Sequence, residues 1–262
     1  MWIGLDEEEA MKEDSMTSDE FFTIITSLIN IAKELQVPLE RWRTVHNLFI
    51  LKEANNYNIT RLRPLHKIEA ELNLIRREVI TRRLLRQAER VKYLDDNSYG
   101  GRNGRSAMDA VLKKFLTLQA MHLARSNGAL TDCDAKACYD RVIPLVLYLS
   151  YSKAGLPHAA CVWLCKSLTQ MKYHVTTAHG ISDNCSMSTP ERTLYGVGQG
   201  ATDAPTGWLF ISTILSQTQD DLGQGCTIAD PTSTKTVTWT HVIFVDDTYL
   251  IHSLADPEAT PT

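Results

Sequence analysis

Apolar residues recur at helical spacing in several separate parts of the chain. Residues 18–35 predict a first helix, with Ser18 as a candidate cap, acidic residues in the first turn and Pro38 beyond the end. The clearest helix is expected from about residue 68 to Val91, with arginines on its other faces. Its apolar stripe follows the i, i+4, i+7, i+11 pattern and consists of Ile68, Leu72, Ile75 and Val79.

A further helix is predicted after the loop at 95–106. Ser106 and Asp109 have the spacing of an approximate capping box, and one side of the helix would carry Met108, Val111, Phe115 and Leu118. Asn127-Gly128 should end this helix, because both residues favour turns. Later helices are expected at about 140–153, 157–171 and 203–222, the last with Pro205 in its first turn.

Extended segments lie between these helices. Residues 43–52 and 59–66 predict a hairpin around the turn at 53–58, and this hairpin carries Lys52, Arg61 and Arg63. Further strands are expected at 129–135, at 172–178 and 193–197 around a polar loop, and at 234–245 and 248–253 as the arms of a second hairpin. The mixture of helices and hairpins predicts an α+β fold.

Length and composition fit a globular chain of 262 residues, enough for one large domain or two small ones. The longest apolar stretch, 21–32, is too short to cross a membrane, and the acidic leader at 1–16 is unlike a secretory signal or a transit peptide. Six cysteines show no zinc-finger spacing, and Cys161 and Cys165 are interpreted as packing residues on a helix. We therefore expect a reduced, intracellular protein.

Charge is distributed unevenly along the chain, although the net charge is only −4. The first 40 residues are strongly acidic, whereas residues 41–105 contain 15 basic and 7 acidic side chains. Such a basic block is expected where a protein faces a polyanion. A well-solvated helix surface would give the same pattern, and charge alone leaves both interpretations open.

Two adjacent aspartates, Asp246 and Asp247, interrupt the apolar segment VIFVDDTYLI at the tip of the second predicted hairpin. Like charges at a hairpin tip repel each other unless a cation lies beside them, and carboxylate oxygens suit Mg²⁺. Asp134, at the end of another predicted strand, could complete a two-metal site for phosphoryl transfer. Taken alone, the Asp246–Asp247 pair and the Asp134 segment each also fit the alternative of an ordinary solvated turn.

Five segments together resemble the reverse transcriptases, and are most similar to those of non-LTR (LINE-type) retrotransposons. FVDD (244–247) resembles the family's Y/F-x-D-D motif, and DAKACYD (134–140) its D-x-x-x-A-F-D element, although Ala137 and Cys138 both precede the aromatic residue here. GVGQGATDAP (196–205) resembles G-x-x-Q-G-x-x-x-S-P, YGGRNGRSAMDAV (99–111) resembles Y-G-F-R-x-G-R-S, and ILKEANNYNITRLRPLH (50–66) resembles the fingers hairpin. All five occur in the family's order.

The resemblance implies the fingers and palm of a right-hand polymerase, with an antiparallel palm sheet and packed helices. The expected divisions are an acidic leader and N-terminal helix (1–37), a fingers-like basic region (38–128) and a palm-like catalytic region (129–262). Since the chain ends soon after the FVDD hairpin, the thumb and the later palm elements are expected to be absent. A thumb or the remainder of a polyprotein would then come from elsewhere.

The implied activity is RNA-directed DNA synthesis, in which a primer 3′-OH attacks a dNTP on an RNA template with two Mg²⁺ ions, or Mn²⁺. The resemblance assigns the metal and catalytic roles to Asp134, Asp246 and Asp247, with Asp247 in a supporting place. Tyr139 matches the family's aromatic steric gate, which disfavours an RNA-dependent RNA polymerase. The other implied substrate residues are Gln199, Gly200, Lys52, Arg61 and Arg63.

Several positions depart from the family pattern. Ala204 replaces a serine, Gly101 replaces a phenylalanine, and Asp203 adds a negative charge near the expected path of the phosphates. Together with the expected lack of a thumb, these departures leave a second hypothesis open. In that alternative, the chain is a truncated, inactive retroelement remnant that at most binds nucleic acid.

Overall fold

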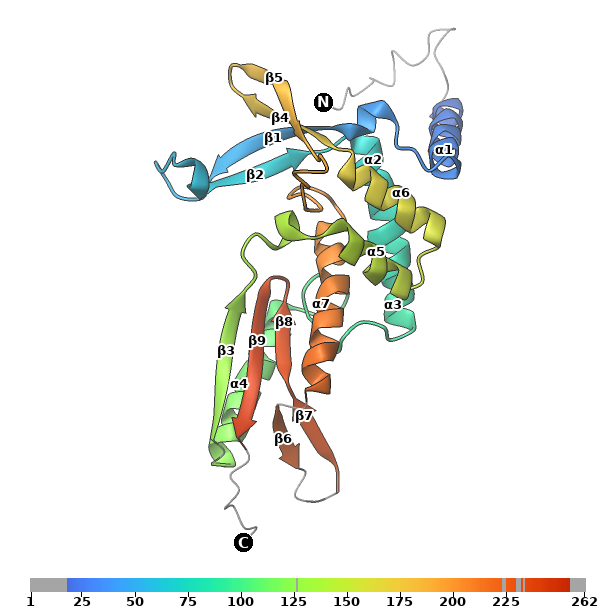
Figure 1. The fold of residues 1–262 in the computed structure, drawn as a ribbon. Helices are drawn as coiled ribbons and strands as arrows, with labels where there is room; N and C mark the ends of the chain where they lie inside the picture. The colour runs from blue at the N-terminus through green and yellow to red at the C-terminus, as the bar shows by residue number, and fades with distance from the viewer. Residues whose placement is uncertain (1–17, 126, 223–224, 230–231, 233, 255–262) are drawn as a thin grey trace.

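The computed structural model describes residues 18–125, 127–222, 225–229, 232 and 234–254. A four-stranded and a three-stranded β-sheet lie toward opposite ends of an elongated molecule, and α7 (Ala204–Asp221) extends from the middle of the molecule along the three-stranded sheet (Figure 1). None of the described helices is long and apolar enough to cross a membrane. The acidic leader at 1–16 lies outside the described residues.

The first sheet is built on the predicted hairpin. β1 (Thr44–Leu51) and β2 (Leu62–Lys67) pair antiparallel after the short 3₁₀ turns η2 (Glu40–Arg43) and η3 (Ile59–Arg61). β1 also pairs in parallel with β4 (Lys172–Thr177), which pairs antiparallel with β5 (Gly180–Met187). The strand order is therefore β2–β1–β4–β5, and the later half of the chain supplies two of the four strands.

The prediction of a strand at 193–197 is wrong, because β4 pairs instead with β5, which lies within the presumed polar loop. Gly180, with φ of 131°, permits the tight turn between these strands. The backbone N–H groups of Gly196 and Val197 instead donate to the carbonyls of Val142 and Tyr139, each at 2.8 Å. Residues 196–197 therefore fasten their loop to the 3₁₀ turn η5 (Cys138–Arg141), which lies earlier in the chain, rather than extend the sheet.

Five helical elements surround the main core. The predicted helix at 68–91 is confirmed as one continuous rod made of α2 (Ala70–Arg76), a π-helical segment η4 (Arg77–Leu84) and α3 (Leu85–Arg90). It is joined by α1 (Ser18–Glu34), α5 (Pro144–Lys153), α6 (His158–Thr169) and α7. The wider π turn was not foreseen from apolar spacing, because the stripe reads as an ordinary α-helix.

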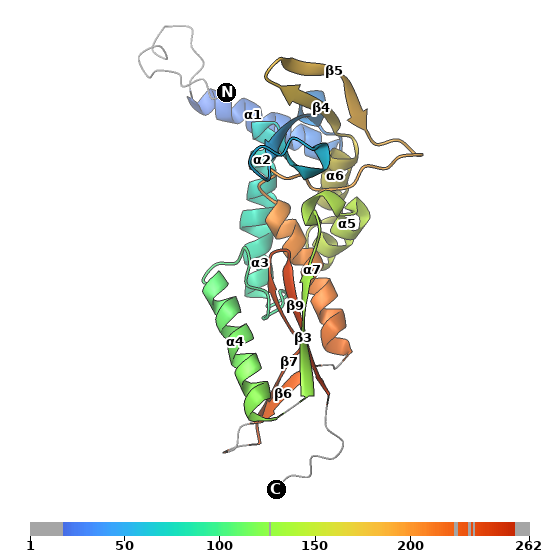
Figure 2. The same cartoon turned by 90° about the vertical axis from the view of Figure 1, so that its left-hand side faces the viewer.

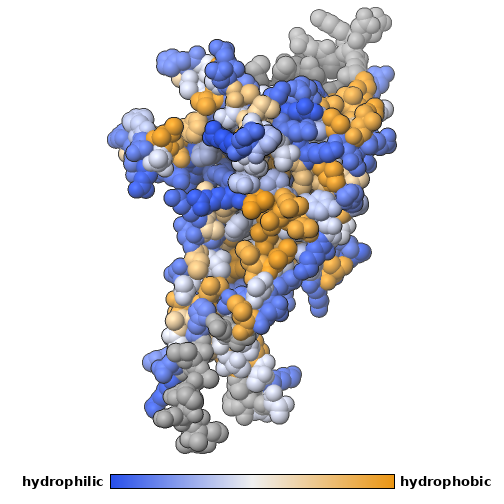
Figure 3. All heavy atoms as spheres, viewed as in Figure 1, coloured by the Kyte–Doolittle hydropathy of each residue, from blue (hydrophilic) through white to orange (hydrophobic). Residues whose placement is uncertain are grey.

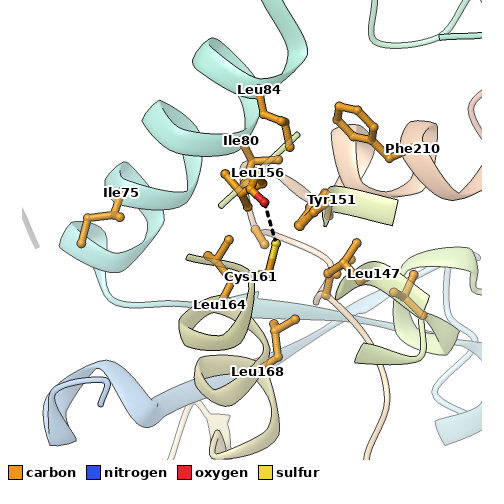
Figure 4. Packing of buried hydrophobic residues seen from close by; sticks show 14 of the residues in the cluster. Ile75, Ile80, Leu84, Leu147, Tyr151, Leu156, Cys161, Leu164, Leu168 and Phe210 are labelled. Carbon is orange, nitrogen blue, oxygen red and sulfur yellow. Dashed lines mark hydrogen bonds between the residues drawn. The ribbon is translucent and has the colours of Figure 1, made fainter. Parts of the chain in front are cut away.

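The core itself lies where this rod meets α5, α6 and α7 (Figure 4). Ile80 and Leu84 from the rod, Tyr151 from α5 and Phe210 from α7 are all buried there, and the rings of Tyr151 and Phe210 meet edge to face at 5.7 Å. The Cys161 thiol donates to the Leu156 carbonyl at 3.5 Å. Burial raises the pKa of this thiol to about 11, which fits the predicted packing role.

The second sheet contains the aspartate hairpin. Its order is β3 (Asn127–Asp134), β9 (Asp247–Leu254) and β8 (His241–Phe244), all antiparallel. The predicted first arm at 234–245 is split in two. β7 (Thr236–Trp239) pairs with β6 (Cys226–Ala229), and the chain changes sheets at Thr240, whose carbonyl accepts a hydrogen bond from the Ile251 N–H at 2.8 Å.

α4 (Ala107–Leu123) covers one side of this second sheet and is seen at its edge in Figure 2. The predicted capping box is confirmed: the Ser106 hydroxyl accepts from the Asp109 N–H, and the Asp109 carboxylate accepts from the Ser106 N–H at 2.7 Å. The helix buries Ala110, Thr117 and Met121. The predicted apolar side, with Met108, Val111, Phe115 and Leu118, is exposed to solvent.

Candidate functional site

The turn that carries Asp246 is held from two sides. Val245 has φ of 57°, an unusual conformation for a β-branched residue. The Trp208 indole N–H of α7 donates to the Val245 carbonyl at 2.7 Å. On the other side, a Cβ at Gly100 would lie only 2.6 Å from the Val245 nitrogen, so glycine is needed for this close approach.

The register of β3 and β9 brings Asp134 to the same turn. Asp134 is the last residue of β3 and lies opposite Asp247, the first residue of β9. The next N–H, of Ala135, donates to the Asp246 carbonyl at 3.3 Å. Asp246 is half-buried, whereas Asp134 and Asp247 are exposed. Three carboxylates from two elements therefore gather at one end of the sheet.

A single cleft of about 580 Å³ lies between this end of the sheet and the β1–β2 hairpin. Seven of the nine residues predicted for the site line it: Lys52, Arg63, Asp134, Tyr139, Gln199, Gly200 and Asp246. The two exceptions are Arg61, which pairs with Glu53 at 3.5 Å, and Asp247. Residues separated by almost 200 positions in the sequence thus share one concave surface.

Tyr139 lies in η5 (Cys138–Arg141), which begins after Ala137 in a left-handed conformation, φ 53°. Its ring is half-buried, packs against the main core and also lines the cleft. Burial, with smaller contributions from Cys138 and the Asp246 charge, raises the pKa of the Tyr139 phenol to about 12. The phenol therefore stays neutral at physiological pH and presents an aromatic wall next to Asp246.

The loop with Gln199 and Gly200 is fastened to β2. The His66 N–H donates to the Gln199 carbonyl at 2.6 Å, and the Gln199 amide donates to Asp140 at 2.9 Å. A Cβ at Gly200 would lie 2.4 Å from the His66 carbonyl oxygen, which requires glycine. Burial raises the pKa of Asp140, although His66, Gln199 and Lys52 all act to lower it. The loop thus links the two walls of the cleft.

Asp203 corrects one expectation from the sequence. Its carboxylate is buried and forms an ion pair with Arg76 at 2.9 Å, so it adds no free negative charge to the path of a phosphate. The same guanidinium donates to the Val197 carbonyl at 3.1 Å. Ala204, which stands where the family has serine, lines the cleft and is itself almost fully buried.

Lys136 is a cleft residue that the sequence reasoning missed. The signal was available: a cationic side chain two positions after Asp134 and just before the turn at Ala137 must lie near the same carboxylate. With Lys52 and Arg63 it gives the cleft three basic side chains facing a region that also holds two carboxylates. Such a surface can bind a polyphosphate next to a cation site.

The donor set at this end of the sheet suits Mg²⁺, because Asp134, Asp246 and Asp247 offer only carboxylate oxygens. Among the described residues, a tighter group of possible ligands lies elsewhere, where atoms of Asp95, Asp220 and His241 are within 4.8 Å of one another. There, however, both imidazole nitrogens are already engaged. His241 Nε2 is hydrogen-bonded to Asp95, and Nδ1 to the Thr240 hydroxyl at 2.7 Å.

Comparison with solved structures identifies similar folds among telomerases, which are reverse-transcriptase-type enzymes. Telomerase from Candida albicans in complex with the TWJ fragment of telomeric RNA matches with a TM-score of 0.52 at 12% identity, over 90% of this chain and 43% of that chain. The corresponding complex of Candida tropicalis telomerase matches with a TM-score of 0.53 at 13% identity, over 95% of this chain and 42% of that chain. Apo telomerase from Candida tropicalis, truncated from its C-terminal domain, matches with a TM-score of 0.51 at 12% identity, over 90% of this chain and 49% of that chain.

No family model and no curated protein matches the sequence. The chain spans less than half the length of the telomerase chains to which it is similar. At these identities the likeness concerns the fold alone. The fold is therefore α+β and similar to the fingers and palm of a reverse-transcriptase-type polymerase.

Proposed function

We propose that this chain is the fingers and palm of an RNA-directed DNA polymerase from a retroelement of the non-LTR type. The observation that carries the proposal is the shared cleft, in which Asp134 and Asp246 lie with Lys52, Arg63, Tyr139 and Gln199. Four of the five family-like segments, far apart in sequence, supply all of these residues. The reverse-transcriptase-like fold supports the same reading.

In this proposal the carboxylates of Asp134 and Asp246 hold divalent cations, with Asp247 supporting them from the first position of β9. Bound Mg²⁺ would activate the attacking hydroxyl and stabilise the leaving oxygen. The half-buried state of Asp246 favours the role, because a carboxylate partly removed from water gains more from a neighbouring cation.

The basic residues of the cleft serve the nucleotide. Lys52 and Arg63 come from the β1–β2 hairpin, and Lys136 comes from the turn after β3, so their charges approach a triphosphate from both sides. Arg63 can bind phosphate oxygens with two N–H groups, whereas the lysines act as point charges. Arg61 has a smaller part in this scheme, because Glu53 already pairs with it.

Tyr139 and Gln199 define the shape of the nucleotide site. The Tyr139 ring, fixed by core packing on one side, would meet the 2′-OH of a ribonucleotide and so favour dNTPs. The Gln199 amide is held by Asp140, and Gly200 lets the backbone approach β2 and the nucleotide closely. An RNA template and a DNA primer are the nucleic-acid partners under this proposal.

The test is primer extension on an RNA template with Mg²⁺ and dNTPs. Asp134→Asn and Asp246→Asn should each reduce incorporation at least about 100-fold. The matched control is Asp132→Asn, since Asp132 is an exposed carboxylate on the same strand, paired with Lys114 at 3.2 Å and outside the cleft. Mn²⁺ in place of Mg²⁺ tests whether the site accepts the alternative ion.

Incorporation retained by both cleft variants would contradict the assignment of the carboxylates. A folded wild-type chain that binds RNA but incorporates nothing would favour the alternative of an inactive remnant. The specific observation behind that alternative is that the three aspartates do not form a tight ligand group among the described residues.

A further inference from the structure

The outer side of α4 is an apolar surface that no described element covers. Its seven large apolar side chains are between 43% and 80% exposed: Met108, Val111, Leu112, Phe115, Leu116, Leu118 and Leu123. Their spacing of three and four residues runs the whole length of the helix. An apolar stripe of this kind ordinarily marks the side that a helix turns toward a partner.

The orientation of α4 is fixed by contacts on its inner side. Lys114 pairs with Asp132 at 3.2 Å, and its ammonium lies 3.4 Å from the centre of the Tyr249 ring. Thr117 and Met121 are buried on the same side. Turning the stripe inward would break these contacts and expose the buried residues, so α4 cannot cover its own apolar side by rotation.

The exposed area is large for a monomer. Seven such side chains at these exposures present on the order of 700 Å² of mostly apolar surface, close to the roughly 800 Å² that each partner contributes to a standard protein interface. Two copies of α4 facing each other would therefore bury enough surface for a stable dimer.

The position of Phe115 in the stripe favours a second copy of this chain in antiparallel orientation. Phe115 lies at the middle of α4, so a two-fold axis there would place Leu112 opposite Leu118, and Met108 opposite His122. The apolar residues of one copy would therefore meet apolar residues of the other along the helix. Antiparallel helix dipoles also favour this arrangement.

We propose that the chain forms a symmetric dimer through α4, with the two helices antiparallel and Phe115 near the axis. The inference is independent of the polymerase proposal, because α4 lies outside the cleft. In Figure 2 α4 lies at an outer edge of the molecule, where a second copy can approach it.

A second apolar area lies over α5 and α7, visible in Figure 3. Exposed leucines on these two helices are Leu145 and Leu149 of α5 and Leu215 of α7. This area mixes residues from two helices and lacks the self-complementary order of α4. It serves as the matched control in the test.

The first measurement is the mass of the full chain over a concentration series by sedimentation equilibrium. A reversible dimer is expected, and Leu112→Glu with Phe115→Glu should weaken it by about 30-fold or more. Leu145 on α5 is at least as exposed as Leu112 and Phe115, and Leu145→Glu should leave the dimer unchanged. A monomer at every concentration, or a dimer that depends on Leu145 instead, would overturn the proposal.

Cysteine cross-linking tests the orientation with milder changes. The exposed native thiols Cys133 and Cys185 are first replaced by serine. Phe115→Cys should then form a disulfide-linked dimer on oxidation. Leu123→Cys should not, since eight residues on each copy separate the two thiols by about 24 Å along the antiparallel axis. Cross-linking of both variants would indicate parallel helices and reject the proposed arrangement.

Discussion

Arg76 and Asp203 form a buried ion pair at 2.9 Å, each side chain only 2% exposed. The pair joins the long helical rod to the start of α7, and the same guanidinium holds the Val197 carbonyl of the loop that precedes Gln199. It therefore connects the core to one wall of the cleft. A charge buried this deeply is tolerated only with its partner in place.

Removal of one partner should destabilise the fold more than removal of both. Arg76→Met leaves the Asp203 carboxylate uncompensated and should lower the free energy of unfolding by about 3–5 kcal/mol. The double variant Arg76→Met with Asp203→Leu should recover much of that loss. Urea unfolding of the wild type, of Arg76→Met and of the double variant measures the three free energies. An Arg76→Met variant within about 1 kcal/mol of wild type would contradict the buried pair.

Gly100→Ala should disturb the Asp246 turn. A new Cβ would lie 2.6 Å from the Val245 backbone nitrogen, so the turn must move. We expect the Gly100→Ala variant to lose nucleotide incorporation in the primer-extension assay. Gly101→Ala is the control: Gly101 has φ of 72°, so alanine costs about 1 kcal/mol, but no atom lies within 4 Å of the new Cβ. Equal activity in the two variants would show that the turn tolerates the displacement.

Because of Asp95, the free energy of unfolding should decrease at acid pH. Burial acts to raise the pKa of its carboxyl, but the hydrogen bond and charge of His241, with help from Asn97 and Ser216, hold the pKa below the ordinary 3.8. A carboxyl with a lowered folded pKa stabilises the fold above its unfolded pKa. That contribution is lost as the pH falls through the folded value.

Asp95→Asn should therefore lower the free energy of unfolding by roughly 2 kcal/mol near pH 6, and the difference from wild type should shrink below pH 3.8. Asp96→Asn is the matched control, because the Asp96 side chain is 93% exposed. Chemical unfolding over a pH series makes the measurement. A difference that stays constant down to acid pH would show that the carboxyl charge is not responsible.

Tyr139→Ala should admit ribonucleotides. Loss of the ring removes the wall beside Asp246, so the ratio of kcat/KM for rNTPs to that for dNTPs should rise roughly tenfold or more. Tyr139→Phe should keep the wild-type ratio, since the ring rather than the hydroxyl excludes the 2′-OH. An unchanged ratio in the alanine variant would leave Tyr139 with a packing role only.

Local rules predicted several elements of the fold. The capping box at Ser106 and the turn residues at 53–58 specify α4 and the β1–β2 hairpin through neighbouring residues alone. The aspartate hairpin was predicted for the same reason. Seven of the nine predicted site residues line one cleft because the family-like motifs carry information about spatial neighbours that spacing does not.

Long-range contacts account for what was not foreseen. From the sequence, 193–197 was expected to be a strand and the β5 segment a polar loop, and only the pairing of β4 with β5 shows otherwise. The charge of Asp203 looked free because its partner, Arg76, is more than 120 residues away. The outward side of α4 follows from contacts of Lys114 with Asp132 and Tyr249, which no periodicity reveals.

The parallel pairing of β1 with β4 also sets an order of events during translation. Thr44 pairs with Lys172, so the ribosome must add roughly 105 residues after the β1–β2 hairpin ends at Lys67 before that edge is closed, which takes about 5–21 s at ordinary rates. Until then the nascent hairpin has an open edge that can pair wrongly. The two walls of the cleft are thus completed late, and the turn at Asp246 emerges after both of these sheet strands.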